Sequence, residues 1–75
     1  MVIHIITNIY RNIETGQYIE RWVAGHTFQE ACNIAILKAE EDEETRKIIL
    51  VERLYASKDI DKTTKGFDEV WKNLQ

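Results

Sequence analysis

Apolar residues alternate at strand spacing in three segments of the chain and recur at helical spacing in two others. Residues 2–12 are rich in isoleucine, a β-branched residue typical of strands, and residues 18–23 have a similar strand-like composition. Gly16 lies between these two segments, where it supplies the positive φ that a tight turn requires. The pattern therefore predicts an antiparallel hairpin, with Gly25 closing the second strand.

A helix is predicted to follow the hairpin, because Thr27 and Glu30 have the spacing of a capping box. From there the apolar residues fall on one stripe at helical spacing: Phe28, Ala31, Cys32, Ala35, Ile36 and Ala39. Asp42 is the first residue on this stripe that is costly to bury, so we expect the core-facing part of the helix to end within residues 38–41. Ile34 and Leu37 point away from the stripe and form a smaller apolar patch that needs a partner.

Residues 47–57 are predicted to form a third strand that is largely apolar on both faces. One face is expected to carry Ile48, Leu50, Leu54 and Ala56, and the other Ile49, Val51, Arg53 and Tyr55. A sheet with two apolar faces needs a cover on each of them. A polar connection over residues 58–65 leads to a short last helix with apolar residues at helical spacing: Phe67, Val70, Trp71 and Leu74.

These elements predict one α+β domain over residues 1–75, in the order strand, strand, helix, strand, helix, with a mainly antiparallel three-stranded sheet. One amphipathic helix packs on the sheet. If this helix crosses back over the sheet, the third strand pairs beside the first in the order 2-1-3; pairing beside the second strand would be parallel. Both orders stay open at this point, as does the role of the last helix, which either covers the second sheet face or mediates association.

Five consecutive acids at residues 40–44 lie where the first helix is expected to end. The helix dipole makes each acid there unfavourable by about 0.3–1 kcal/mol. The net charge of the chain is only -3, but residues 26–45 contain six acids and one lysine. Such a local field attracts basic surfaces and disfavours nucleic-acid backbones.

The acidic run has a purely structural interpretation as well as a functional one. If the helix continues to Lys47, Asp42 can pair with Arg46 and Glu43 with Lys47, each pair contributing about 0.3–0.5 kcal/mol. In the functional interpretation the acids steer a basic partner and exposed apolar residues anchor it. The predicted partner-binding residues are then Glu40, Glu41, Asp42, Glu43, Glu44, Ile34, Leu37 and Trp71.

A second candidate surface is an aromatic face of the hairpin. Tyr10, Tyr18 and Trp22 can lie on one face with Arg21 nearby, and aromatic rings interleaved with arginines stack the bases of single-stranded nucleic acids. The competing interpretation is that these side chains are core residues. It is favoured because the chain lacks the basic stripe typical of nucleic-acid binders.

No catalytic or metal-binding motif is present in the sequence. His26 and Cys32 are separated by five residues, and no second pair completes a zinc site. Glu20, Glu52 and His4 could act as acid and base only if the fold gathers them. We therefore expect no enzyme activity, no cofactor and no metal.

The sequence predicts a small acidic interaction protein, an inhibitor or regulator that binds a basic protein; the alternative is a binder of single-stranded nucleic acid. The isoleucine, lysine and asparagine content is compatible with a phage or mobile-element origin. A homodimer is an option, because a chain of 75 residues buries only about 60% of its surface on folding.

We expect a cytoplasmic protein without a membrane anchor. Cys32 is the only cysteine, so no disulfide can form within the chain. Residues 2–6 lack the basic flank and cleavage site of a signal peptide, and no apolar run approaches the ~20 residues of a membrane span.

Overall fold

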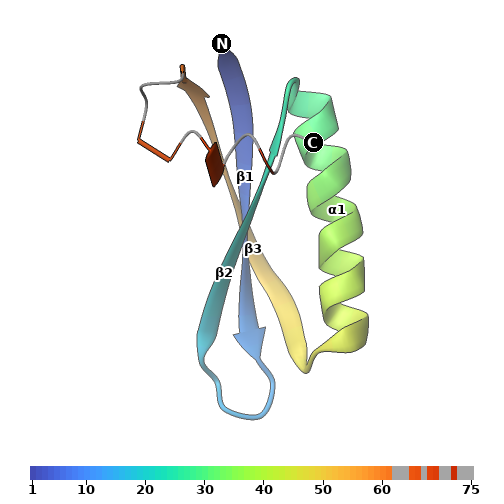
Figure 1. Cartoon of the computed structure of the whole chain (residues 1–75). Coiled ribbons are helices and arrows are strands. Elements are labelled where there is room, and N and C mark those ends of the chain that lie inside the picture. The colour runs from blue at the N-terminus through green and yellow to red at the C-terminus, as the bar shows by residue number, and fades with distance from the viewer. Residues whose placement is uncertain (62–64, 67, 70–71, 73–75) are drawn as a thin grey trace.

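One antiparallel sheet and one long helix make up the part of the chain that the computed structural model describes, residues 1–61, 65–66, 68–69 and 72. The strands β1 (Val2–Asn12), β2 (Tyr18–Gly25) and β3 (Ile48–Asp59) are arranged in the order β2-β1-β3. The helix α1 (Phe28–Thr45) lies along one face of this sheet (Figure 1). The α+β class and the antiparallel sheet are thus confirmed. Of the two strand orders that the sequence leaves open, the structure has the one in which β3 returns beside β1.

The predicted hairpin between β1 and β2 is confirmed, and its turn explains the glycine. Gly16 has a φ of 76° and donates its N–H to the carbonyl of Asn12 at 2.9 Å. The Asn12 side-chain oxygen accepts hydrogen bonds from the backbone N–H groups of Glu14 and Thr15. An asparagine that bonds the following backbone stabilises a tight turn.

Alanines allow α1 to lie close to the sheet. Ala31, Ala35 and Ala39 are buried against residues of β1 and β2 that include Ile6, Tyr10 and Val23. The helix approaches the sheet closely at the end of β2, where a Cβ added to Gly25 would lie 2.6 Å from the backbone N of Ala31. This distance is too short for any side chain, so glycine is required here to let the helix begin against the sheet.

The predicted capping box is confirmed in its threonine half. The hydroxyl of Thr27 accepts a hydrogen bond from the backbone N–H of Glu30 at 3.1 Å, which satisfies one of the free donors at the start of α1. The carboxylate of Glu30 lies 3.4 Å from Nδ1 of His26. Histidine before the cap is therefore part of the helix start.

The prediction that the core-facing stripe ends before Asp42 is wrong. The helix continues through the acidic run to Thr45, and Asp42 is itself buried, with 7% of its surface exposed. This burial is accommodated because basic side chains from another element and from the next turn reach its carboxylate.

The predicted face assignment of the third strand is also wrong, because β3 contains a bulge. Ile9 of β1 pairs with Glu52, whereas the next residue, Tyr10, pairs with Leu50, so Val51 is an extra residue. One inserted residue exchanges the two faces from that point onward. Ile48 and Leu50 consequently face α1, while Leu54 and Ala56 lie on the opposite face.

The four apolar residues of the predicted last helix, Phe67, Val70, Trp71 and Leu74, lie outside the described residues, so that helix stays a prediction. Within the described ranges, no helix combines the length and the apolar character needed to cross a bilayer.

Candidate protein-interaction site

The side of α1 that faces away from the sheet carries two large apolar residues followed by acids. Asn33, Leu37, Glu40 and Glu44 succeed one another at helical spacing, and Ile36 lies beside them. All five are exposed; Leu37 retains 65% of its accessible surface and Ile36 44%. Asn33, Ile36 and Leu37 line a shallow groove. We call these five residues the outer surface of α1.

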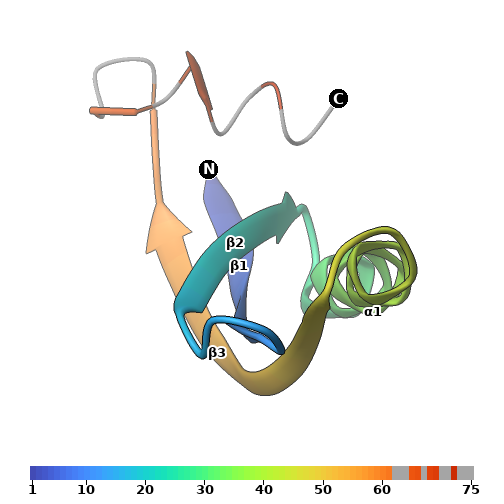
Figure 2. The same cartoon turned by 90° about the horizontal axis from the view of Figure 1, so that it is seen from below.

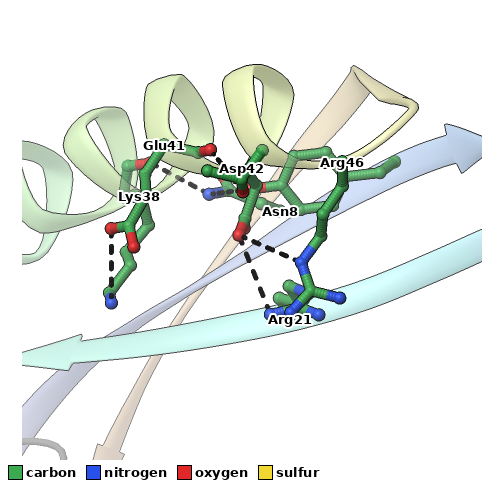
Figure 3. Close-up of polar contacts among 9 residues, drawn as sticks. Asn8, Arg21, Lys38, Glu41, Asp42 and Arg46 are labelled. Atoms are coloured by element: carbon green, nitrogen blue, oxygen red, sulfur yellow. Dashed lines mark hydrogen bonds and ion pairs between the residues drawn. The ribbon is translucent and has the colours of Figure 1, made fainter.

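Asp42 is the acid of the run that the fold uses internally (Figure 3). One carboxylate oxygen lies 3.7 Å from Nη1 of Arg21 on β2 and 4.0 Å from Nε of Arg46, one turn further along the chain. The buried Tyr10 hydroxyl also bonds to Asp42. Burial, together with this bond, raises the pKa of Tyr10. Asp42 therefore joins the end of α1 to β1 and β2.

Two further acids of the run have weak partners within the chain. Glu41 lies 3.8 Å from Nζ of Lys38, and both side chains are largely exposed. Figure 3 shows this pair on the side of α1 that faces β2. An oxygen of Glu43 accepts from the backbone N–H of Leu50 at 3.5 Å, the long limit for a hydrogen bond. The predicted pair of Glu43 with Lys47 is not formed, since Lys47 reaches Glu14 at 2.7 Å.

Among the described residues, Glu40 and Glu44 are the acids of the run that have no partner. Within the described part of the chain, neither carboxylate is in an ion pair or a side-chain hydrogen bond. The last turn of α1 contains no base to offset the helix dipole. The exposed negative charges of Glu40 and Glu44 therefore lie on the outer surface of α1.

The predicted apolar anchors have different positions in the structure. Leu37 is exposed and lies on the outer surface of α1, as expected. Ile34 is half-buried and packs against the core cluster formed by Ile6, Val23, Ala31 and Ala35, so it is not an exposed anchor. Trp71 lies outside the described residues. Ile36, which the sequence assigned to the core stripe, is exposed and takes its place beside Leu37.

The aromatic residues predicted for a nucleic-acid face do not share one face. Tyr10 is fully buried beneath α1, and Arg21 lies on that same helix-facing side of the sheet. Trp22 pairs with Thr7 and Tyr18 with Arg11, which places both on the opposite side. Since strand residues alternate between faces, Tyr10 and Trp22 cannot form one stacking platform.

The carboxylates and histidine considered for acid–base chemistry are separated by the sheet. Glu20 and Glu52 both pair with Ile9 and flank it on the face away from α1, whereas His4 lies on the helix-facing side. His4 Nδ1 instead shares a hydrogen bond of 2.7 Å with the hydroxyl of Tyr55. Among the described residues, no group of three His, Cys, Asp or Glu side chains is arranged to hold a metal ion.

A buried polar contact beneath α1 was not found from the sequence. The amide of Asn8 is buried; its Nδ2 donates to the carbonyl of Ala35 at 2.9 Å, and its oxygen accepts from Nε of Arg53 at the same distance. The available signal was a lone asparagine at an inward position of an isoleucine-rich strand. These bonds fix the helix to β1 and, through Arg53, to β3.

A cleft of about 220 Å³ lies between β2 and the C-terminal half of α1. Arg21 and Trp22 form one side of it, and Lys38, Asp42 and Arg46 contribute to the other. Bases and acids are mixed along its walls, and the acids already contact the bases. The cleft therefore has no charge preference that would identify a ligand.

Comparison of the chain with protein-family models, with curated proteins and with solved structures found no match.

Proposed function

We propose that this protein is a small interaction module that binds a basic surface of another protein through the outer surface of α1. By binding there, it regulates or inhibits that partner protein. The observation that supports this proposal is the division of the acidic run. Asp42 is used by the fold, whereas Glu40 and Glu44 remain unpaired among the described residues, next to the exposed Leu37 and Ile36.

The arrangement is unfavourable for the isolated chain. Glu40 and Glu44 repel each other at i,i+4 by about 0.2–0.5 kcal/mol, and the helix dipole adds about 0.3–1 kcal/mol for an acid in the last turn. The exposed side chains of Ile36 and Leu37 also keep apolar surface in contact with water, which is unfavourable and would be removed by burial against a partner. A partner with basic and apolar groups would offset all three terms at once.

The chemical roles of the two groups differ. Contact of Leu37 and Ile36 with an apolar patch supplies affinity, because burial of apolar area is the main favourable term in association. The carboxylates accelerate the encounter with a basic surface and orient it. Binding that covers a functional basic site on the partner would inhibit it.

A set of four proteins tests this proposal. Four immobilised proteins are incubated with an extract of the native cell. They are the wild type, Glu40→Gln/Glu44→Gln, Leu37→Ser and the control Glu14→Gln/Glu20→Gln. The control removes two exposed acids outside α1, Glu20 on β2 and Glu14 in the β1–β2 turn, where it pairs with Lys47, so it matches the change in net charge. We expect wild type and control to retain the same basic protein, and the two α1 variants to lose it.

The retained protein is then purified and its association rate is measured at two ionic strengths. The proposal requires the wild type to associate about tenfold faster than the Glu40→Gln/Glu44→Gln variant at low salt, with the difference shrinking at high salt. Retention of no protein, or equal loss in the control and the α1 variants, contradicts the proposal.

A further inference from the structure

The part of β3 beyond the bulge is exposed along its whole length. Every residue from Val51 to Asp59 is exposed, including Val51, Leu54 and Tyr55, each of which retains about half of its accessible surface at 47%, 48% and 50%. β3 is an edge strand of the sheet, and it runs away from the end of α1 rather than beneath it (Figure 2). The helix packs on β1, β2 and the start of β3, and its first residue, Phe28, meets Tyr55, but this segment stays exposed.

An open edge of this kind readily pairs with another strand. Among the residues that the structure describes, its outward N–H and C=O groups have no ladder partner, and the segment contains no proline to prevent pairing. The bulge at Val51 marks one end of the regular segment and Asp59 the other, so Tyr55 lies at its midpoint. A strand that pairs with an identical strand about a two-fold axis does so symmetrically around one residue.

We infer that β3 pairs with β3 of a second copy of this chain, antiparallel and centred on Tyr55, to give a six-stranded sheet. In this register Glu52 of one copy lies opposite Lys58 of the other, and the symmetry repeats the pair. Leu54 lies opposite Ala56, and Arg53 lies opposite Ser57. The pairs Glu52–Lys58 and Leu54–Ala56 thus match opposite charges and apolar residues, which is the arrangement that stabilises strand pairs.

The two neighbouring symmetric registers match less well. Centring on Leu54 puts Glu52 opposite Ala56 and Lys58 opposite Leu50, so neither charge has a partner. Centring on Ala56 puts Lys58 opposite Leu54. That register would also pair Arg53 with Asp59, but Arg53 already bonds Asn8 and Asp59 already contacts the N-terminal amine. Charge complementarity therefore selects Tyr55 as the centre.

An aromatic cluster would lie at the junction of the two copies. Tyr55 stacks on His4 with ring centroids 5.9 Å apart and meets the edge of Phe28 at 4.9 Å. Phe28 is exposed at the start of α1, with 52% of its surface accessible. Two such clusters facing each other across the axis would remove these rings from water. A two-fold axis perpendicular to the sheet keeps both helices on one side, so the dimer presents two outer surfaces of α1 together.

Charge reversal tests the register. Sedimentation velocity over a range of concentrations gives the dimer dissociation constant for four variants of the full chain. Glu52→Lys and Lys58→Glu each place like charges opposite each other twice, and we expect each to weaken the dimer by about tenfold. The double variant restores both pairs and the wild-type net charge, so it should restore the dimer. Glu20→Lys, on the other edge strand, is the matched control and should dimerise like the wild type.

Cross-linking tests the axis independently of affinity. In a Cys32→Ser background, Tyr55→Cys places two thiols opposite each other on the axis, where Cα atoms of paired strands are about 4.5–5.5 Å apart and suit a disulfide. We expect rapid disulfide formation for Tyr55→Cys and slow formation for Ala56→Cys, whose mate is Leu54. A wild type that stays monomeric at millimolar concentration, a dimer unaffected by Glu52→Lys, or faster cross-linking at Ala56 overturns the inference.

Discussion

The inner and outer sides of the last turns of α1 carry the same kind of residue in opposite situations. On the inner side, Asp42 is buried and meets Arg21, Arg46 and Tyr10. On the outer side, Glu40 and Glu44 are exposed and, in the described part of the chain, unpaired. The helical repeat therefore places acids that are adjacent in the sequence on different sides of α1. Asp42 has a structural role on the inner side, and Glu40 and Glu44 form an exposed acidic surface on the outer side. The difference separates the acid that the fold uses from the acids that it does not use.

The largest expected effect is at the point where the inner side touches the sheet. Gly25→Ala places a Cβ against the backbone N of Ala31, so the helix must shift and unfolding free energy should fall by about 2–3 kcal/mol. Leu37→Ala on the outer side should change it by less than about 0.5 kcal/mol. Urea unfolding followed by circular dichroism measures both. Equal losses for the two variants would show that the outer side is also structural.

The next effect compares the acids directly by isosteric neutralisation. Asp42→Asn removes the charge that pairs with Arg21 and Arg46 and accepts the bond from Tyr10, so we expect a loss of about 1–2 kcal/mol. The figure is moderate because the Arg21 side chain is 39% exposed and solvent screens the pair.

Neutralising the outer acids should have the opposite sign. Glu40→Gln/Glu44→Gln removes a like-charge pair near the negative end of the helix dipole, so unfolding free energy should rise by about 0.5 kcal/mol. The same urea titrations measure this gain. A clear loss of stability in this double variant would mean that the carboxylates have a structural role within the chain.

The smallest expected effect is a decrease of the unfolding free energy at alkaline pH. Burial and the bond to Asp42 raise the pKa of Tyr10 in the folded protein, so the neutral ring contributes stability below the ordinary tyrosine pKa of about 10. That contribution is lost as pH rises through the folded-state pKa. The unfolding free energy of the wild type should thus fall more steeply than that of Tyr10→Phe between about pH 9 and pH 11. Tyr18→Phe, on the exposed strand end, should follow the wild type.

Local signals in the sequence were sufficient for the hairpin and the helix start. Gly16 requires its turn, and Thr27 caps α1 through a bond to a residue three positions away. These features depend on neighbours in the chain, so spacing alone reveals them.

Features that depend on distant partners were not predictable in the same way. The cost of burying Asp42 is offset by Arg21, which the strand pairing brings across from β2. The bulge at Val51 is a property of the pairing with β1, and it reverses the faces of β3 without altering the composition of the strand. Tyr10 and Trp22 were placed together for the same reason, because alternation from one strand to the next depends on register.

Association rates with the basic partner, measured for two neutralised variants, decide whether the outer acids serve binding. If the outer acids exist for binding, Glu40→Gln/Glu44→Gln should slow association about tenfold at low ionic strength while the protein stays fully folded. The matched control Glu14→Gln/Glu20→Gln should associate at the wild-type rate. Equal rates for wild type and the α1 variant at every ionic strength would show that Glu40 and Glu44 do not steer a basic partner.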